Sequence, residues 1–228
     1  MINRELYMEQ ITPFIDKPFV KVITGIRRCG KSVVLRLIRE ELLRRGVSED
    51  HIIYMNFESF EWMDVKEAKA LYTYIREVTK VSGKYYILLD EIQEVTDWEK
   101  AVNAFLVDLD ADIYVTGSNS RLLSSEFSTY LAGRYVAFHI MTLSFREYLL
   151  FHNVPLAISA SDRKAEFLKY LRMGGFPAIH TANYDYNAIY KIVYDIYSSV
   201  ILRDTVQRHG IRNVEMLERI VKLSLIHI

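Results

Sequence analysis

The sequence predicts a three-layer α/β fold, in which helices cover both faces of a parallel sheet. Segments typical of strands alternate with segments of helical periodicity as far as about residue 155. The run YYILLDE at 85–91 is almost continuously apolar before its two acids, as expected for a strand buried on both faces of such a sheet. We therefore expect a ligand at the carboxyl ends of the strands.

The individual elements follow from periodicity and from helix-stop signals. After a short helix and turn within 1–18, strands are expected at 19–24, 51–57, 85–91, 112–120 and 135–140, and helices at 33–45, 64–81, 98–109 and 144–151. Asp97 is expected to cap the helix that follows it, and Trp98 to lie in the core. Beyond Ser161 only helical patterns remain, at 162–173 before Gly174, at about 186–208, and after Asn213 as an N-cap.

This change of character predicts a domain at 1–155 and a helical segment at 156–222. The last six residues, LSLIHI at 223–228, back-translate to the end sequence of a transposase-based sequencing adapter. We therefore expect the natural chain to continue past Lys222 and leave 223–228 out of the fold prediction.

Composition excludes few functions. Lys plus Arg equals Asp plus Glu, so the zero net charge demands neither nucleic acid nor a membrane surface as partner. No apolar run approaches the length of a membrane span, and the single cysteine excludes an internal disulfide framework, which favours the cytoplasm. The six histidines are scattered without metal-ligand spacing and are interpreted as structural or surface residues.

The residues Gly25 to Ser32, GIRRCGKS, fit the P-loop pattern G-x-x-x-x-G-K-[ST] without mismatch. An apolar strand precedes them and a helix follows, as the motif requires. The backbone N–H groups are expected to hold phosphate, Lys31 to reach the β- and γ-phosphates, and Ser32 to ligate Mg²⁺. The predicted nucleotide-binding residues are Gly25, Ile26, Arg27, Arg28, Cys29, Gly30, Lys31, Ser32, Val33 and, from a later strand, Ser118.

Two adjacent carboxylates end the buried strand at 85–91. Asp90 is expected to hold Mg²⁺, mostly through water, and Glu91 to orient and deprotonate a water beside the γ-phosphate. The pair favours hydrolysis over phosphate transfer to a small substrate. No guanine-reading NKxD-type motif is present, which favours ATP over GTP.

The polar tip of the strand at 112–120 is a second candidate. If this strand lies between the P-loop strand and the acid-bearing strand, Ser118 or Asn119 can bond to the attacking water or the γ-phosphate. The same residues can also simply close a turn and cap the next helix.

Several arginines and the cysteine stay open to two interpretations. Arg134, and second to it Arg121, is a candidate for an arginine supplied in trans by a neighbouring subunit, or an ordinary surface residue. Arg27 and Arg28 can touch phosphate or face a carboxylate of the second domain. Cys29 is favoured as a small loop filler over a redox switch.

The motifs GIRRCGKS, LLDEIQ, TGSNSRLLS, LAGRY and LSFREYL, in this order, resemble the prokaryotic AAA-type ATPases of the AAA+ superfamily that carry a C-terminal domain of unknown function. The resemblance covers roughly residues 4–222. It implies a sheet of order 5-1-4-3-2, ATP and Mg²⁺ as ligands, and the following roles: Lys31 and Ser32 in the P-loop, Asp90 and Glu91 as the acid pair, Ser118 or Asn119 as sensor.

Members of that family usually continue into a winged-helix-like segment and a further domain. GGFPAI at 174–179 and the helices after it resemble the start of this region. The chain departs from the family mainly by ending early.

The leading hypothesis is an ATPase in which Glu91, Lys31, Asn119 and Arg134 act in catalysis and the nucleotide state moves the helical C-terminal part. The alternative is a slow nucleotide-dependent switch that recruits a protein or DNA partner. A P-loop kinase is the third reading, and the acid pair and the lack of an evident Arg-rich lid count against it.

Overall fold

The computed structural model describes residues 3–118, 130–182, 184–198, 206, 211, 213–217 and 219–220. The chain forms two compact units, Met1–Met141 and Thr142–Ile228, which are described separately. Among the described residues, no helix combines the length and apolar character needed to cross a membrane.

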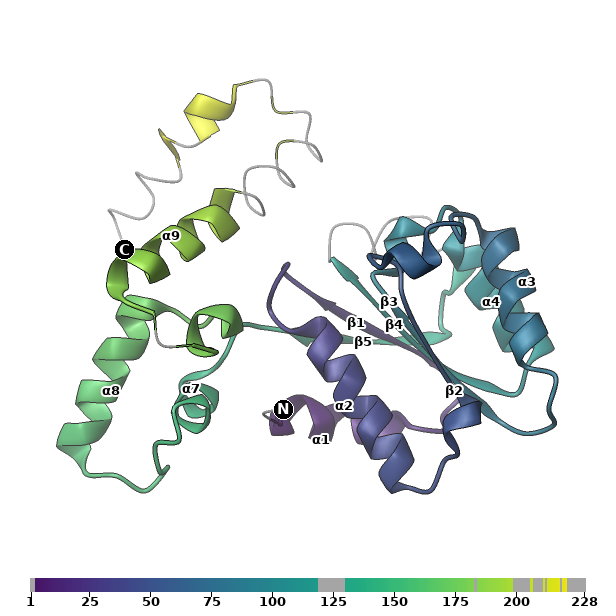
Figure 1. Ribbon diagram of the computed structural model, residues 1–228, viewed down its shortest axis with the longest axis horizontal. Coiled ribbons are helices and arrows are strands. Elements are labelled where there is room, and N and C mark those ends of the chain that lie inside the picture. Colours follow the sequence, from purple (N-terminus) through teal and green to yellow (C-terminus); the bar gives the residue numbers. More distant parts are fainter. Residues whose placement is uncertain are drawn as a thin grey trace. The chain divides into compact units, whose positions relative to one another are not determined.

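The first unit is built on one five-stranded sheet with the spatial order β2-β3-β4-β1-β5 (Figure 1). All neighbouring strands are parallel. This arrangement confirms the predicted α/β class and the order 5-1-4-3-2, with β4 between β1 and β3. The strands are β1 (Val20–Gly25), β2 (Ile52–Asn56), β3 (Tyr85–Asp90), β4 (Ala111–Ser118) and β5 (Tyr135–Ile140).

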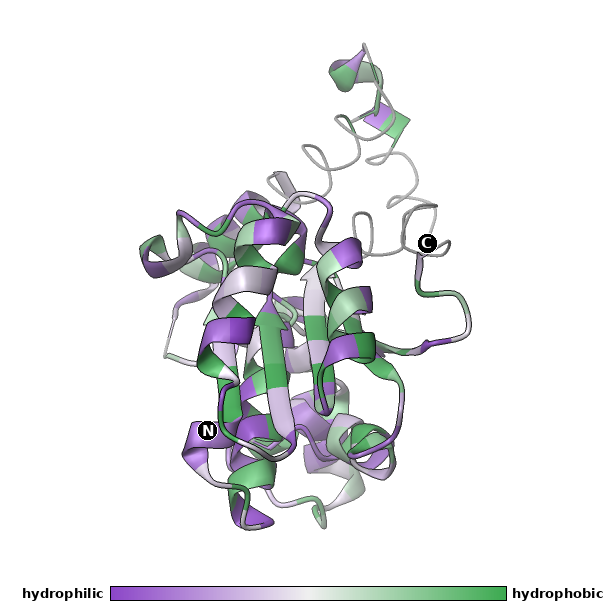
Figure 2. Cartoon of the chain, turned by 90° about the vertical axis from the view of Figure 1, so that its right-hand side faces the viewer, coloured by the Kyte–Doolittle hydropathy of each residue, from purple (hydrophilic) through white to green (hydrophobic). Residues whose placement is uncertain are grey.

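Helices pack on both faces of this sheet. The helices are α1 (Glu5–Ile11), α2 (Lys31–Arg44), α3 (Ala68–Val78) and α4 (Trp98–Asp108), and short 3-10 turns lie at Thr12–Phe14, Glu49–His51, Phe60–Trp62 and Ile92–Glu94. The covering helices alternate apolar and polar positions, whereas the strands are mostly apolar (Figure 2). Such patterning is typical of a sheet that both layers of helices bury.

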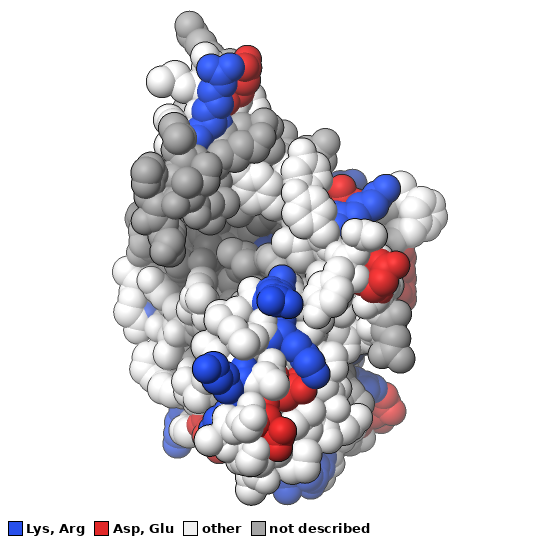
Figure 3. Space-filling view, turned by 90° about the vertical axis from the view of Figure 1, so that its left-hand side faces the viewer, with Lys and Arg blue, Asp and Glu red and all other residues white. Residues whose placement is uncertain are grey.

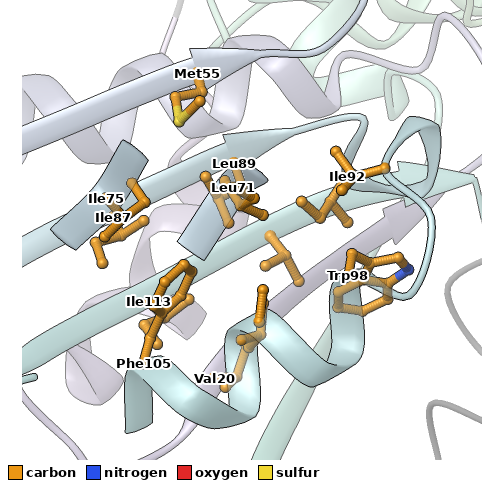
Figure 4. Packing of buried hydrophobic residues seen from close by; sticks show 14 of the residues in the cluster. Val20, Met55, Leu71, Ile75, Ile87, Leu89, Ile92, Trp98, Phe105 and Ile113 are labelled. Atoms are coloured by element: carbon orange, nitrogen blue, oxygen red, sulfur yellow. The ribbon is translucent and has the colours of Figure 1, made fainter. Parts of the chain in front are cut away.

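Two apolar cores result, one on each face. Side chains from α3 and α4 meet alternate strand residues such as Val20, Ile87 and Ile113 in one core (Figure 4). On the other face, α1 and α2 pack against the intervening residues, among them Ile23 and Tyr114. The period of two along each strand thus decides which face a residue joins.

Helix α4 starts at Trp98 as predicted, whereas α2 starts two residues before the predicted residue 33, and α3 and the cap of α4 also differ from the prediction. The helix expected at 64–81 is α3, which begins only at Ala68 because the backbone of 66–68 bonds to Thr96 instead. Trp98 is buried as predicted, but the prediction of an Asp97 cap is wrong. Asp97 adopts a left-handed φ of 57° and its carboxylate pairs with Lys100, whereas a capping side chain needs an extended backbone.

The second unit begins with α7 (Phe145–Phe151), α8 (Ala160–Met173), a 3-10 turn at Pro177–His180 and α9 (Tyr186–Tyr197). Phe145 of α7 packs on Phe167 and Tyr170 of α8, with ring centroids 5.1 and 5.7 Å apart. This contact joins α7 to the second unit, whose first residue is Thr142, whereas the sequence predicts a boundary near residue 155. A family domain that ends near residue 155 remains a prediction.

Two helix boundaries in this unit confirm the sequence signals. Gly174, with a φ of 81°, ends α8, and the Asn213 side chain accepts a hydrogen bond of 2.9 Å from the Met216 N–H. The expected helix at 186–208 is described as α9 up to Tyr197, and most of the remainder lies outside the described residues. So do Lys222 and the suspected artefact at 223–228.

Candidate functional site

The P-loop connects the end of β1 to the start of α2, at the carboxyl edge of the sheet. Gly25 has a φ of 154°, and an added Cβ would stand 2.4 Å from the Ile140 carbonyl oxygen and 2.7 Å from the Cys29 sulfur. Only glycine fits here, because the loop turns directly against β5. Gly30 and Arg28 also have positive φ values, of 106° and 63°, which curl the loop around the start of α2.

The N-cap residue of helix α2 provides no capping side chain. Its N-cap is Gly30, and Lys31 and Ser32 are the first two helical residues. Their N–H groups lack intrahelical acceptors because of where they stand in the helix. An N-terminus of this kind attracts anions through its free donors and the helix dipole.

Lys31 is the buried cation of the site, only 4% exposed. Its ammonium lies 3.4 Å from a Glu91 carboxylate oxygen and 3.4 Å from the Ile26 carbonyl oxygen, which accepts its hydrogen bond. Both distances are long for charge-assisted bonds. The lysine is therefore held loosely and keeps capacity for a closer anionic partner.

Asp90 is fully buried at the end of β3 and is oriented by two hydroxyl groups. The Tyr54 hydroxyl donates to one carboxylate oxygen at 3.0 Å, and the Thr116 hydroxyl donates to the other. Burial and the neighbouring Asp90 charge raise the pKa of the Tyr54 phenol above its ordinary value, so that Tyr54 remains a donor at neutral pH. The orientation of Asp90 is thus set by β2 and β4.

Glu91 adopts a backbone conformation that is rare for a residue with a side chain. Its φ is 54°, and its N–H donates to the Thr116 hydroxyl oxygen at 3.0 Å. A non-glycine residue in the left-handed region costs on the order of 1 kcal/mol and persists where function or surrounding contacts hold it. Thr116 therefore aligns both acids, one through its O–H and one through its oxygen.

Gln93 occupies the second carboxylate oxygen of Glu91. Its side-chain amide donates to that oxygen at 2.6 Å, while its own buried carbonyl oxygen has no hydrogen-bond partner. Both Glu91 oxygens thus have a partner, one in Gln93 and one in Lys31. In this arrangement the Glu91 carboxylate is ion-paired and restrained.

Sequence reasoning missed Tyr54, Thr116 and Gln93. A signal for Thr116 was present, because Asp112, Tyr114 and Thr116 alternate with apolar residues along β4 and therefore share one sheet face. Nothing comparable marked Tyr54. Its role depends on the pairing of β2 with β3, which places it beside Leu88, two residues before Asp90.

The remaining predicted residues of the P-loop take different positions. The exposed Arg27 lies 3.4 Å from Glu58, in the segment that follows β2, and Arg28 is also exposed. Cys29 is fully buried, and burial raises the pKa of its thiol, which agrees with a loop filler. Val33 donates its N–H to Gly30, in the first turn of α2.

Of the two other candidates outside the loop that the structure describes, Ser118 lies at the site and Arg134 does not. Its backbone pairs with Gly25, since β4 lies next to β1. The exposed Arg134 precedes β5 at the opposite, amino edge of the sheet, where its guanidinium donates to Asn103 at 3.0 Å. Asn119 and Arg121 lie outside the described residues.

The donor set suits a polyphosphate with a divalent cation. The first N–H groups of α2, the Lys31 ammonium, the Ser32 hydroxyl and the two acids stand at one edge of the sheet. The uncapped N-terminus and the long Lys31 contacts are the observations that fit a nucleotide phosphate. Elsewhere among the described residues, no three His, Cys, Asp or Glu side chains gather as a metal site.

Comparison with known proteins agrees with this geometry. Residues 17–149 match the family described as AAA domain. A protein of Haemophilus influenzae is 40% identical over 222 residues, which cover 97% of this chain and 54% of that protein. One from Methanocaldococcus jannaschii is 34% identical over 223 residues, with coverages of 96% and 48%.

Both relatives are described as uncharacterized proteins, and the chain spans about half of their length. Among solved structures, Cdc6p from Pyrobaculum aerophilum is similar with a TM-score of 0.49 and 14% identity, covering 93% of this chain and 64% of that one.

Proposed function

Since the chain belongs to the AAA domain family, we propose that it binds ATP with Mg²⁺ and hydrolyses it to ADP and phosphate. One observation carries the proposal. The buried Lys31 at the first position of α2 lies 3.4 Å from the buried Glu91, beside an uncapped helix N-terminus. A binding group for phosphate and a candidate base for water thus stand at one place.

The residues divide the work of hydrolysis between binding and proton transfer. The P-loop N–H groups and Lys31 hold the β- and γ-phosphate oxygens and stabilise the charge that develops on them. Glu91 orients a water and accepts a proton from it as the water oxygen bonds to the γ-phosphorus. The bond from that phosphorus to the bridging oxygen breaks, and ADP leaves.

Ser32 and Asp90 are the residues that would hold Mg²⁺, Asp90 mostly through water. The ion would neutralise negative charge on the β- and γ-phosphate oxygens. Tyr54 and Thr116 keep the Asp90 carboxylate in one orientation. The two hydroxyl groups therefore act as positioning groups for a metal ligand.

For Glu91 to act as base, it must exchange its present partners. Phosphate oxygens are stronger partners for Lys31 than a carboxylate 3.4 Å away, so bound ATP would draw the ammonium from Glu91. Gln93 remains as the second restraint. ATP binding would thereby release Glu91 from Lys31 and allow it to act as the base.

Several finer features belong to this proposal. We assign Asn119 a polar contact to the water or γ-phosphate, and Arg134 a role in trans within a homo-oligomer. We propose cytoplasmic action and a family domain at 1–155, which passes its nucleotide state to a helical segment at 156–222. The whole relatives are about twice as long, so the process driven is assigned to the full-length protein.

The decisive experiment compares Mg-ATP turnover and ATP affinity in the wild type and Glu91→Gln. We expect the variant to bind ATP with unchanged affinity and to turn over about 10²- to 10⁴-fold more slowly. Glu94→Gln, an exposed position in the same turn, is the matched control and should keep wild-type turnover. A Glu91→Gln variant as active as the wild type would refute the assignment of the base.

A second candidate function, a slow nucleotide-dependent switch for a protein or DNA partner, is favoured by the restrained Glu91. Partners on both of its oxygens predict weak basal turnover. On the face drawn in Figure 3, Lys and Arg side chains are interspersed with Asp and Glu, so that face offers no uniform attraction to DNA. Turnover that duplex DNA stimulates would support the DNA partner, and ATP binding without turnover would support the switch.

A further inference from the structure

Arg4 is a buried arginine, with an exposed fraction of only 2%. It is far in sequence from the acid pair Asp90 and Glu91. It stands at the start of α1, where its carbonyl oxygen accepts hydrogen bonds from the Tyr7 and Met8 N–H groups. Its guanidinium lies over the Tyr7 ring, 4.7 Å from the centroid. A buried guanidinium is retained only where hydrogen bonds compensate its desolvation, so its partners are informative.

Two of those partners are backbone carbonyls from separate parts of the unit. One guanidinium nitrogen donates to the Cys29 carbonyl oxygen in the P-loop at 3.0 Å. The other donates to the Met141 carbonyl oxygen just after β5, also at 3.0 Å. The planar fork of arginine can bridge two acceptors in this way, whereas the single ammonium of lysine cannot hold the same geometry.

Met141 is held at its N–H group as well. This N–H donates to the Tyr7 hydroxyl oxygen at 3.0 Å, so that α1 fixes both polar groups of the residue. Met141 is the last residue of the first unit, and the chain continues from it directly into the second. The junction therefore begins at a residue tied to α1.

The P-loop and the end of β5 also touch without Arg4. Gly25 pairs with Ile140 in the parallel register, and the close approach of the Ile140 carbonyl leaves no room for a side chain at Gly25. A packed contact of this kind transmits displacement, because tightly packed interiors resist compression. Movement of the loop reaches the residue before Met141 directly.

We propose that Arg4 is a positioning residue that holds the P-loop in its phosphate-binding conformation and couples the loop to the unit junction at Met141. The inference rests on the proposed function, since nucleotide is the ligand that would move the loop. Phosphate binding shifts the Cys29 carbonyl, and the guanidinium passes this shift to Met141. Arg4 thereby connects the nucleotide site to the start of the second unit.

Hydrogen exchange tests this coupling at two places in one experiment. Peptides covering the P-loop at 25–33 and the junction at 139–145 are followed with and without Mg-ATP, and ATP affinity is measured in parallel. In the wild type we expect protection of both peptides. Arg4→Ala should lower ATP affinity about tenfold and abolish the protection of the junction.

Two further variants separate coupling from general loss of structure. Tyr7→Phe keeps the ring beneath Arg4 and removes only the hydroxyl that binds Met141, so we expect it to reduce junction protection while ATP affinity stays within about twofold. Arg76→Ala is the matched control: this exposed arginine of α3 also donates to a backbone carbonyl, that of Asp108. It should change neither readout.

The outcomes distinguish the two proposals. ATP protection of the P-loop but not of the junction in the wild type would overturn the coupling and leave the proposed function standing. A folded Arg4→Ala variant with unchanged ATP affinity and unchanged junction protection would also overturn the coupling and leave the proposed function standing. If Mg-ATP protects neither peptide of the wild type, the proposed function fails and the coupling with it.

Should Arg4→Ala fail to fold, Arg4→Lys provides the second test. Lysine keeps the charge but not the two-pronged contact, so the coupling should still be lost. Where Arg4→Ala does fold, restored junction protection when guanidinium ion is added to it, far below concentrations that unfold the protein, would support the coupling. Full coupling in Arg4→Lys would overturn it.

Discussion

The two edges of the sheet each contain a buried lysine paired with a carboxylate, and the two pairs differ in how fully they are satisfied. At the amino edge, Lys21 and Asp112 form a close pair, with side chains 0% and 1% exposed. At the carboxyl edge, Lys31 and Glu91 lie 3.4 Å apart, with side chains 3% and 10% exposed. Burial alone does not tell the two apart.

The two lysine–carboxylate pairs differ instead in their additional hydrogen bonds. Lys21 also donates to the Lys17 carbonyl at 2.9 Å, and Asp112 accepts from the Asp16 N–H at 2.9 Å and the Tyr114 hydroxyl at 2.8 Å. The amino-edge network thus fixes the chain before β1 to β4. Among the described residues, the Lys31 ammonium instead contacts Glu91 and the Ile26 carbonyl oxygen at 3.4 Å each, and a phosphate can replace these long contacts.

A buried ion pair whose hydrogen bonds are all made is therefore structural, whereas a pair held by long contacts is available to a ligand. Removing a partner should therefore cost stability at the amino edge and ligand affinity at the carboxyl edge. Substitutions at the two edges test this division, and the largest effect is expected at Asp112.

Asp112→Ala should give the largest effect, because it leaves the Lys21 ammonium buried without its carboxylate. We expect a loss of about 3–5 kcal/mol in the free energy of unfolding, measured by urea denaturation. The exposed Asp110→Asn, two residues earlier, should change it by less than about 0.5 kcal/mol. An Asp112→Ala variant as stable as the control would contradict a structural role for the pair.

Lys31→Ala should affect the ligand more than the fold. Loss of a charge-assisted contact to phosphate predicts an ATP affinity that is lower by about 10- to 100-fold, measured by titration calorimetry. Its loss of unfolding free energy should be smaller than that of Asp112→Ala. If Lys31→Ala lost more unfolding free energy than Asp112→Ala, the distinction between a structural pair and a ligand-binding pair would be wrong.

Gln93→Ala tests whether the restraint on Glu91 limits turnover. Removing the 2.6 Å bond frees one carboxylate oxygen, and we expect turnover at saturating Mg-ATP to rise about fivefold, with ATP affinity unchanged. Steady-state assays that separate kcat from KM measure this. Lower turnover would instead mean that Gln93 orients Glu91 productively.

The smallest expected effect is a pH dependence of the free energy of unfolding that arises from Asp16 in the amino-edge network. Burial opposes ionisation of Asp16, but hydrogen bonds from Tyr86 and Lys84 outweigh it and lower the pKa of the carboxyl below its ordinary 3.8. The unfolded state therefore binds more protons at acid pH. This contribution to stability is complete well above pH 3.8 and is lost as the pH falls through the folded-state pKa.

Urea midpoints measured from about pH 5 to about pH 3 should accordingly fall less steeply in Asp16→Asn than in the wild type. Lys84→Met, which removes one of the charges that favour the Asp16 carboxylate, should reduce the slope in the same direction. Identical slopes in all three proteins would remove Asp16 from the network's stabilising groups.

The sequence was sufficient for the parts of the fold and site that depend on local patterns. The P-loop, the apolar strand before Asp90, the Gly174 stop and the strand order implied by the resemblance are all present in the structure. Each of these features follows from a few consecutive residues or from the order of the family motifs. Local physics or a family pattern was enough.

The missed groups act across long sequence separations. Arg4 bonds to a residue 137 positions away, and Lys21 pairs with one 91 positions away. Their partners are decided by strand order and register, which periodicity alone does not specify. Asp97 was mispredicted for the related reason that its backbone conformation is dictated by the turn before α4.

The position of β4 between β1 and β3 also has a consequence for how the protein is made. In the described sheet the P-loop strand β1 and the acid-bearing strand β3 do not pair with each other, and β4, which is synthesised after both, lies between them and pairs with each. Such non-local parallel pairing is slow, because loop-closure entropy is lost before the contacts that compensate it form. A nascent chain that has not yet exposed β4 would hold a P-loop and an acid pair but no site, and ATP could not assist its folding until that strand arrives.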